Sequence, residues 1–329
     1  MTVNRHFSED AIKSLLGKMA QKRIAVIGDL ILDKFLYGAV SRISPEAPVP
    51  VVDLREERHL LGGAANVVRN IASLGATPEL VGVAGEDAEA AEFLALLEKA
   101  GGRGKGIVTD PSRPTAVKTR VIAQHQQVVR FDREEKAPLP MEIALKVRER
   151  ALDAVSRADA VVISDYGKGI ITRELFAAVT GAAKERGIPL AVDPKPLNTN
   201  CYKGAGVLTP NAKETEEMSG LSVTTDEEAE AAGTKLMDML DAGAMLVTRG
   251  ERGMTLVRRD GVTTHIPTQA KDVYDVTGAG DTAISILTLA WAAGADLTEA
   301  ALLANIASGI VVGKLGTAVV TPAELIEGA

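Results

Sequence analysis

Asp275-Val276-Thr277-Gly278-Ala279-Gly280-Asp281-Thr282 joins a polar segment to a long apolar run, and the rest of the chain is best understood from it. Gly278 and Gly280 lack a Cβ atom, so the backbone can turn sharply there and approach a ligand closely. We expect a helix to begin at Ala279 or Gly280, where the first N–H groups have no partner inside the helix. These groups and the helix dipole favour a bound anion such as a phosphate.

Asp281 falls in the first turn of this expected helix, where a bound phosphate would repel its carboxylate. The repulsion is explained if Asp281 is a general base that takes the proton from a hydroxyl attacking that phosphate. The alternative is a glycine-rich turn in which Asp281 only complements the helix dipole. The eight residues by themselves leave both interpretations open, so other parts of the chain must distinguish them.

The composition limits the possible partners and compartments of the protein. The chain has 329 residues, of which 46% are hydrophobic, so a large core can form. The formal net charge of −7 argues against a general nucleic-acid or acidic-membrane binder. Cys201 is the single cysteine, which excludes an internal disulfide and suits a reducing cytoplasm. The sequence has no apolar run typical of a signal peptide or a membrane span, so we expect neither nucleic acid nor membrane as a partner.

Short apolar runs alternate with polar loops and helical segments along most of the chain. Expected strands at 23–28, 160–164, 190–192, 206–208 and 245–247 each precede a polar or glycine-containing loop. This order predicts a mostly parallel sheet with helices on both faces, a three-layer α/β/α sandwich. The polar loops then meet at one edge of the sheet, where open α/β sheets bind their ligands.

Two segments interrupt the regular α/β order. Residues 39–53 contain three prolines, which exclude a helix and a central strand, and so predict an edge segment or projecting flap. Residues 115–133 read as a β-hairpin in which Lys118 and Arg120 share one face. We interpret the two segments together as a small β lid, spanning about 34–60 and 115–133, on a single domain that covers residues 1–329.

Two sets of candidate binding residues fall at the expected edge. The first suits a nucleoside triphosphate with Mg²⁺, whose waters Glu214 would hold, and consists of Asn211, Glu214, Thr248, Gly250, Gly253, Gly278, Ala279, Gly280 and Asn305. The second combines hydroxyl-binding groups with cations, which suits a sugar that already carries a phosphate, and consists of Asp33, Gly62, Gly63, Asn66, Arg120, Lys168 and Lys195. Arg42 is either a further phosphate ligand or an ordinary surface residue. No P-loop string of the Walker type is present.

The Gly62-Gly63 pair and the string from Thr277 to Thr282 resemble the two sequence motifs of the ribokinase-type (pfkB) carbohydrate kinases, in order and separation. The resemblance covers nearly the whole chain and implies a ribokinase-like fold, ATP and Mg²⁺ as cofactors, and a sugar held by Asp33. It implies that Asp281 is the base, that Gly278, Ala279 and Gly280 form the anion hole, and that Asn211 and Glu214 lie near the phosphates and Mg²⁺. It places Thr248, Gly250 and Asn305 around the nucleotide. Asp275 and Thr277 are similar to residues that bind a monovalent cation such as K⁺ in many members.

Four segments narrow the resemblance within the family: 28–33, 41–50, 62–67 and 193–195. They resemble the enzymes that phosphorylate D-glycero-β-D-manno-heptose 7-phosphate on the way to ADP-heptose and lipopolysaccharide. Because the chain has no His-x-Gly-His string, we expect the kinase alone, without the nucleotidyltransferase often fused to it. The alternatives are a kinase for another phosphosugar, such as a fructose or tagatose phosphate, and a non-catalytic sugar-phosphate sensor. A sensor has little need for the Asp281 carboxylate beside a phosphate.

The expected lid also predicts a homodimer. A flap and a hairpin leave exposed strand edges, which proteins usually cover or pair. A two-fold partner would cover them, as in many members of the family that the sequence resembles. The alternative is a monomer whose lid covers only its own site.

Overall fold

The computed structural model describes residues 7–124, 126–270, 272–314 and 316–329. Its larger sheet has nine strands in the spatial order β13 (Thr263–Ile266), β12 (Met254–Arg258), β11 (Ala244–Thr248), β10 (Val207–Leu208), β9 (Leu190–Asp193), β8 (Ala160–Ser164), β1 (Arg23–Gly28), β4 (Thr77–Ala84) and β5 (Arg103–Thr109). The strands from β11 to β5 are parallel, whereas β12 and β13 form antiparallel pairs at one edge. The mostly parallel sheet predicted from the sequence is therefore confirmed.

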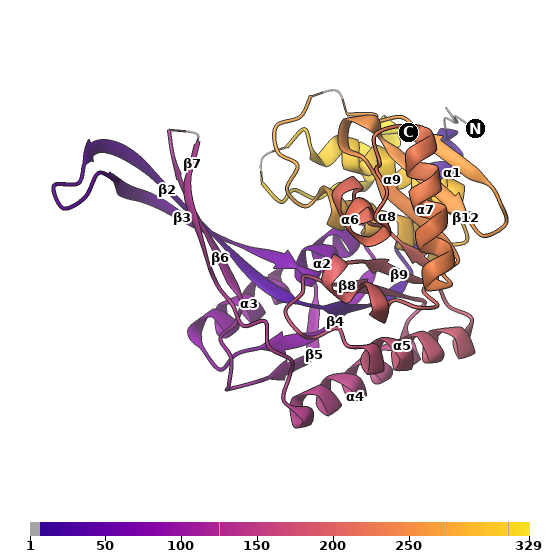
Figure 1. The fold of residues 1–329 in the computed structure, drawn as a ribbon, viewed down its shortest axis with the longest axis horizontal. Helices are drawn as coiled ribbons and strands as arrows, with labels where there is room; N and C mark the ends of the chain where they lie inside the picture. Colours follow the sequence, from indigo (N-terminus) through magenta and orange to yellow (C-terminus); the bar gives the residue numbers. More distant parts are fainter. Residues whose placement is uncertain (1–6, 125, 271, 315) are drawn as a thin grey trace.

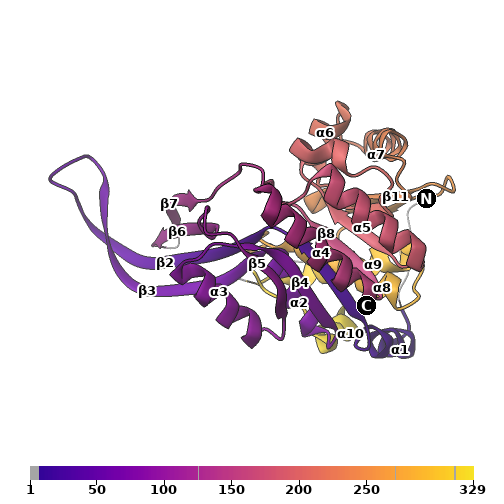
Figure 2. The ribbon, with the colours of Figure 1, turned by 90° about the horizontal axis from the view of Figure 1, so that it is seen from below.

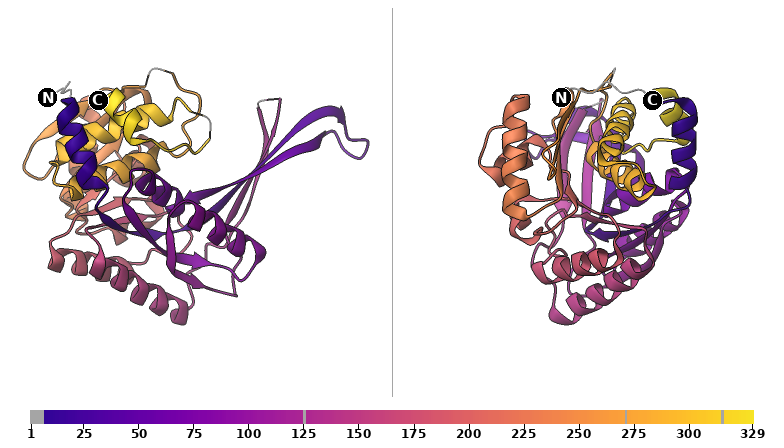
Figure 3. Two further views of the ribbon diagram at one scale, coloured as in Figure 1. Left: turned by 180° about the vertical axis from the view of Figure 1, so that it is seen from behind. Right: turned by 90° about the vertical axis from the view of Figure 1, so that its right-hand side faces the viewer.

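Helices cover both faces of this sheet (Figures 1 and 3). One apolar core lies under α1 (Glu9–Met19), α2 (Ala64–Ser73), α3 (Ala88–Lys99), α8 (Ala279–Ala292), α9 (Leu297–Val311) and α10 (Pro322–Gly328). The other lies under α4 (Met141–Arg157), α5 (Arg173–Arg186) and α7 (Asp226–Leu240). Strand β1 is buried on both faces, since Ile24 and Val26 contribute to the first core and Ala25 and Ile27 to the second. The three-layer α/β/α class is confirmed.

Side-chain caps explain where several helices begin. Ser8, Thr172 and Thr225 each accept a hydrogen bond from a backbone N–H in the first turn of α1, α5 and α7. One short helix, α6 (Ala212–Ser219), was missed by the sequence analysis, which gave 209–214 only as a polar loop. Its apolar periodicity is weak, and its start is fixed by a capping box between Asn211 and Glu214. The described residues also include 3₁₀ segments at Pro196–Cys201 and Gly250–Arg252.

A second sheet of four strands projects from the body of the molecule (Figures 1 and 2). Its order is β3 (Pro50–Gly63), β2 (Leu30–Ile43), β6 (Val117–Ala123) and β7 (Gln126–Arg133), and the predicted lid segments lie in it. Residues 39–53 are not one edge segment but the ends of two long antiparallel strands and their connection. Pro45 and Pro48 lie in that connection and Pro50 begins the outer strand β3, so none of these three prolines interrupts the β2–β3 ladder.

Candidate active site

Helix α8 begins at Ala279, as predicted, and presents its N-terminus at the edge of the large sheet. Gly278 precedes it with φ of 83°, a left-handed conformation that glycine adopts without strain. Among the described residues, no hydrogen-bond acceptor contacts the backbone N–H of Gly280 or Asp281, and a Cβ added at Gly280 would meet open space. The start of α8 therefore offers free N–H donors and room for an anion.

The Asp281 carboxylate is buried in the first turn of α8 and is held at both oxygens. Asn66 Nδ2 donates to Oδ2 at 2.8 Å, and the hydroxyl of Tyr166 donates to Oδ1 at 2.9 Å. Burial raises the pKa of Asp281 to about 6, although both hydrogen bonds oppose the rise. The pKa of Asp281 is therefore close to the value that suits a general base working near neutral pH.

Helix α2 orients the side chains that contact α8. Arg69 donates to Asn66 Oδ1 at 3.3 Å, which turns the amide nitrogen of Asn66 toward Asp281. One turn further on, Thr282 donates to Asn70 Oδ1 at 2.9 Å. A Cβ on Gly278 would lie 2.8 Å from Asn66 Nδ2, so the glycine leaves the space that Asn66 occupies. Asn66 and the glycine motif are thus parts of one arrangement.

A pocket of about 190 Å³ opens beside Asp281. It is lined by Ile31, Asp33, Gly62, Gly63, Lys118, Arg120, Tyr166, Thr277, Gly278, Asp281 and Thr317. Asp33 lies within β2, not in a loop after a strand as the sequence suggested, and it forms an ion pair with Arg120 at 2.5 Å. A Cβ on Gly62 would lie 2.1 Å from Asp33 Oδ2, so a larger residue there would displace this carboxylate. The pocket joins the acidic and basic groups predicted for a sugar phosphate.

Three of the predicted cations, Arg120, Lys168 and Lys195, each form an ion pair with a carboxylate. Lys168 Nζ pairs with Glu134 at 2.5 Å, and Lys195 Nζ pairs with Glu214, which links the two predicted binding sets. Burial would lower the pKa of Lys195, but Glu214 and neighbouring carboxylates outweigh it and raise that pKa. Burial and the charge of Lys168 lower the pKa of Lys118. The cations are close enough to interact with one another.

In the first predicted set, Asn211, Glu214, Thr248 and Gly250 lie at or after the C-terminal ends of β10 and β11, and Asn305 lies on α9. Asn211 and Glu214 form the capping box of α6, and the backbone of Thr248 bridges to Asn211. Gly250 has φ of 59°, and a Cβ there would meet nothing. Asn305, on α9, donates to the carbonyl of Pro267 at 2.8 Å. These residues line one side of the edge on which α8 begins.

Several predicted residues have structural explanations or lie elsewhere. Arg42 is exposed near the outer end of β2, about 30 Å of extended strand from Asp33, and does not line the pocket. Gly253 has φ of 76° and would place a Cβ 2.0 Å from the carbonyl oxygen of Ile266, so close backbone packing requires it. Asp275 accepts from the backbone of Thr277 at 2.9 Å and of Gly316 at 3.1 Å, so both its oxygens have partners.

Tyr166 and Thr317 were not predicted from the sequence, and Lys118 was left open as either a phosphate ligand or a solvated side chain. Tyr166 lies two residues after the end of β8, and its hydroxyl contacts Asp281. Its position after a parallel strand was an available signal, but a tyrosine there is equally typical of core packing. Thr317 lies near the C-terminus, where no motif marked it, and accepts from Arg69 at 2.9 Å through its carbonyl.

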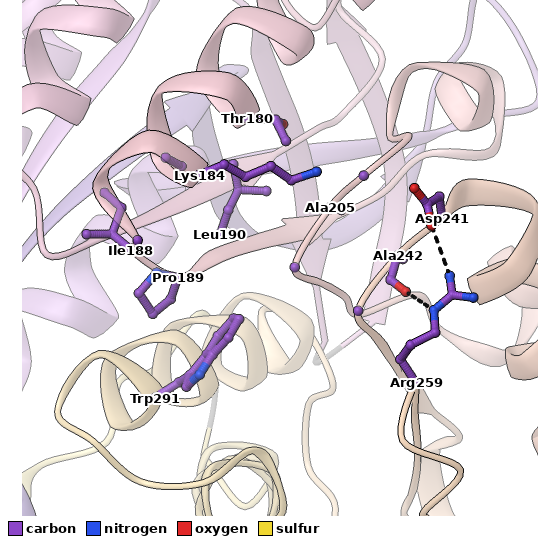
Figure 4. A pocket seen from close by; sticks show the side chains of 15 residues that line it. Thr180, Lys184, Ile188, Pro189, Leu190, Ala205, Asp241, Ala242, Arg259 and Trp291 are labelled. Carbon is purple, nitrogen blue, oxygen red and sulfur yellow. Dashed lines mark hydrogen bonds and ion pairs between the residues drawn. The ribbon is translucent and has the colours of Figure 1, made fainter.

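A larger hollow of about 500 Å³ lies at the opposite edge of the sheet, around Trp291 (Figure 4). The two cations that line it lie at the C-terminal ends of helices, where a positive charge is stabilising. Lys184 lies in the last turn of α5. Arg259 donates to the carbonyl of Ala242 at 3.1 Å and pairs with Asp241, the residue after α7, at 3.5 Å. We therefore place the candidate site at the smaller pocket, where free N–H groups, carboxylates and cations converge.

The part of the chain that the structure describes contains no helix long and apolar enough to cross a membrane. It also contains no cluster of three or more His, Cys, Asp or Glu side chains arranged to hold a metal ion.

Curated relatives match nearly all of the chain. The Bifunctional protein HldE of Paramagnetospirillum magneticum is 44% identical over 316 residues, which are 96% of this chain and 65% of that protein. The Bifunctional protein HldE of Caulobacter vibrioides is 45% identical over 318 residues, again 96% of this chain and 65% of that protein. The chain thus spans just under two thirds of the length of these relatives.

Solved structures share the fold at low sequence identity. Arabidopsis thaliana ribokinase, complexed with ribose and ATP, has a TM-score of 0.75 at 20% identity and covers 94% of this chain and 98% of its own. Phosphofructokinase-2 of Escherichia coli in complex with potassium has a TM-score of 0.75 at 19% identity, covering 93% and 97%. The fold is therefore ribokinase-like. The family model described as pfkB family carbohydrate kinase matches residues 21–324, and the chain is a member of this family of sugar phosphotransferases.

Proposed function

We propose that this sugar kinase transfers the γ-phosphoryl group of ATP to O1 of D-glycero-β-D-manno-heptose 7-phosphate, giving heptose 1,7-bisphosphate. The observation that carries the proposal is the pocket in which Asp281 and Asp33 lie beside Lys118 and Arg120, with Lys168 and Lys195 close by. A neutral sugar needs hydroxyl-binding groups and gains little from clustered cations. The HldE relatives and the four segments that resemble heptose 7-phosphate kinases favour heptose over fructose or tagatose phosphates.

The residues present fit ATP and Mg²⁺. We assign the nucleotide to the side of Asn211, Thr248, Gly250 and Asn305, and its transferred phosphate to the free N–H groups at the start of α8. Glu214 would hold waters of Mg²⁺, which neutralises phosphate charge when bound with ATP. The binding of potassium at Asp275 and Thr277 remains a prediction. Both carboxylate oxygens of Asp275 accept hydrogen bonds from backbone N–H groups in the structure.

In the proposed reaction, Asp33 holds sugar hydroxyls and the O1 hydroxyl faces Asp281. Asp281 takes the proton from O1, O1 forms a bond to the γ-phosphorus, and the bond from that phosphorus to the bridging oxygen of ADP breaks. The N–H groups of Gly280 and Asp281 stabilise the charge on the equatorial oxygens. The Asp281 carboxylate would repel a bound phosphate, but it is needed to take the proton from O1.

We place the activity in the cytoplasmic synthesis of ADP-heptose for lipopolysaccharide. The test is ADP release, measured by a coupled assay, across a panel of phosphosugars and the unphosphorylated heptose. Heptose 7-phosphate should have the highest kcat/KM. Equal turnover of heptose and heptose 7-phosphate would refute the phosphosugar assignment, and preference for a ketohexose phosphate would move the enzyme to the alternative substrate. Binding of sugar phosphate without any turnover would support the sensor.

Lys195→Ala should weaken sugar-phosphate binding by about ten- to a hundredfold and leave ATP binding nearly unchanged. A charge-assisted hydrogen bond to phosphate is worth about 1.5–3 kcal/mol, which corresponds to that range. Calorimetry gives Kd for both ligands. Lys213→Ala is the matched control, because Lys213 lies on nearby α6 with its side chain 83% exposed. An equal loss for ATP and sugar phosphate would assign Lys195, which pairs with Glu214, to the nucleotide instead.

The protein should form a homodimer through the four-stranded lid sheet. Strand β7 is exposed along its whole length and carries Val129 and Phe131, and Ile43 and Leu54 are exposed on the long hairpin. Light scattering at micromolar concentration should give the mass of two chains, and Phe131→Glu should shift it toward one. Leu145→Glu, a similar change on the exposed face of α4, should have no effect. A monomeric parent protein at this concentration would contradict the prediction.

A further inference from the structure

Tyr166 is the one tyrosine whose hydroxyl contacts the candidate base in the described part of the chain, and no motif of the sequence assigned it a role. It follows β8 and donates to Asp281 Oδ1 at 2.9 Å. Resting on the proposed function of Asp281, we propose that Tyr166 is a positioning residue that fixes the orientation and the ionised state of this base. It also couples the base to the cations that hold the far phosphate of the sugar.

Two buried carboxylates fix the loop that carries Tyr166. Asp29 Oδ2 accepts from the backbone N–H of Tyr166 at 2.7 Å and of Lys168 at 3.1 Å. Asp165 accepts from the N–H of Gly167 at 2.7 Å, and its other oxygen accepts from the hydroxyl of Tyr202 at 2.6 Å. Both Asp29 and Asp165 are fully buried. A loop held at three consecutive N–H groups can place one hydroxyl accurately beside a carboxylate.

The two ends of the Tyr166 side chain have different partners. The hydroxyl contacts Asp281, whereas the ring lies under two ammonium groups, Lys118 Nζ at 5.5 Å and Lys195 Nζ at 5.6 Å from its centroid. Cations at such distances are attracted to the face of an aromatic ring. The phenol therefore connects the group that would accept the proton with two groups that would hold the phosphate, and the two connections can be separated by substitution.

The charge state of Tyr166 suits this role. Burial, followed by the negative charges of Asp281 and Asp193, raises the pKa of Tyr166 well above its usual value, so the hydroxyl keeps the proton that it donates to Asp281. A hydrogen bond to a carboxylate favours the ionised form, and the bond from Tyr166 lowers the pKa of Asp281 against the rise caused by burial. Asn66 and Tyr166 donate hydrogen bonds to Asp281, and Asp33, Lys195 and Asp193 act on it through their charge.

Tyr166→Phe tests the hydroxyl alone. Its loss should raise the pKa of Asp281 by about one to two units, so the acid limb of kcat/KM should move from near pH 6 to a higher pH. Activity at pH 7 should fall by about two- to tenfold and recover substantially at pH 9, while KM for the sugar phosphate changes little. An acid limb that stays where it is in the parent protein would overturn the proposal.

Tyr166→Leu tests the ring. It should shift the acid limb as Tyr166→Phe does and should also raise KM for the sugar phosphate by about tenfold, because Lys118 and Lys195 lose the ring beneath them. Equal KM values in the two variants would contradict the proposed coupling of Asp281 to Lys118 and Lys195 through the ring of Tyr166. Tyr37→Phe, a hydroxyl loss on the lid, is the matched control and should leave both quantities unchanged. Circular dichroism checks that each variant is folded.

The outcome is separable from that of the proposed function. If Asp281→Asn keeps normal turnover, the base assignment fails, whatever Tyr166→Phe does. If Asp281→Asn is inactive and Tyr166→Phe has an unshifted acid limb, the base assignment stands and the role of Tyr166 is wrong. The pH profile needs only one phosphosugar that is turned over, so it does not depend on heptose being the substrate.

Discussion

Asp281→Asn should lower kcat by about 10²- to 10⁴-fold, the usual cost of removing a general base. Asparagine has the same shape but only one side-chain oxygen, so it can accept only one of the two hydrogen bonds that Asn66 and Tyr166 donate. It also cannot take a proton from the sugar hydroxyl. Sugar-phosphate binding should change little, because Asp33 and the cations remain. Steady-state kinetics and calorimetry together measure both quantities.

A near-normal kcat in this variant would mean that Asp281 only complements the α8 dipole, and the proposed mechanism would be wrong. Asp296→Asn is a matched control, because Asp296 caps α9 through backbone N–H groups at the start of a helix and does not line the pocket. It should leave kcat unchanged, since asparagine is nearly as good an N-cap as aspartate.

Gly28→Ala should destabilise the fold by about 3 kcal/mol or more, at the upper end of the usual cost of overpacking. Gly28 ends β1 between β4 and β8, and an added Cβ would lie 2.0 Å from the carbonyl oxygen of Ser164 and 3.1 Å from Cβ of Ala64. The first of these is backbone in the neighbouring strand, so no side-chain rotation can relieve the contact. Urea denaturation gives the change in the free energy of unfolding.

The control for this substitution is Gly17→Ala in the last turn of α1. No described heavy atom would lie within 4 Å of the new Cβ, and Gly17 is exposed. Alanine in a helix interior is favoured over glycine by roughly 0.5–1 kcal/mol, so this variant should be slightly more stable than the parent protein. If both variants lose the same stability, the close packing of β1 against β8 does not explain Gly28.

The sequence by itself determined the order of most helices and strands, because that order depends on local chemistry. Apolar runs ending in polar loops marked β1, β8 and β9. The glycines before Asp281 fixed the start of α8 through their backbone freedom alone. The weak apolar periodicity of α6 led to the prediction of a loop where a helix forms. The prolines between β2 and β3 led to the prediction of a single edge segment or flap where two long strands are joined by a short connection.

Only the tertiary structure decided which side chains meet. Asn66 and Tyr166 lie 215 and 115 positions from Asp281 in the sequence, and no local pattern specifies that both donate to its carboxylate. Lys195 and Glu214 were assigned to different ligands from sequence, yet they form an ion pair. Arg42 was grouped with the other cations, but the length of β2 carries it to the outer end of the lid. Such contacts depend on the register of the strands and on how helices pack across the sheet. A local sequence pattern does not specify either of these.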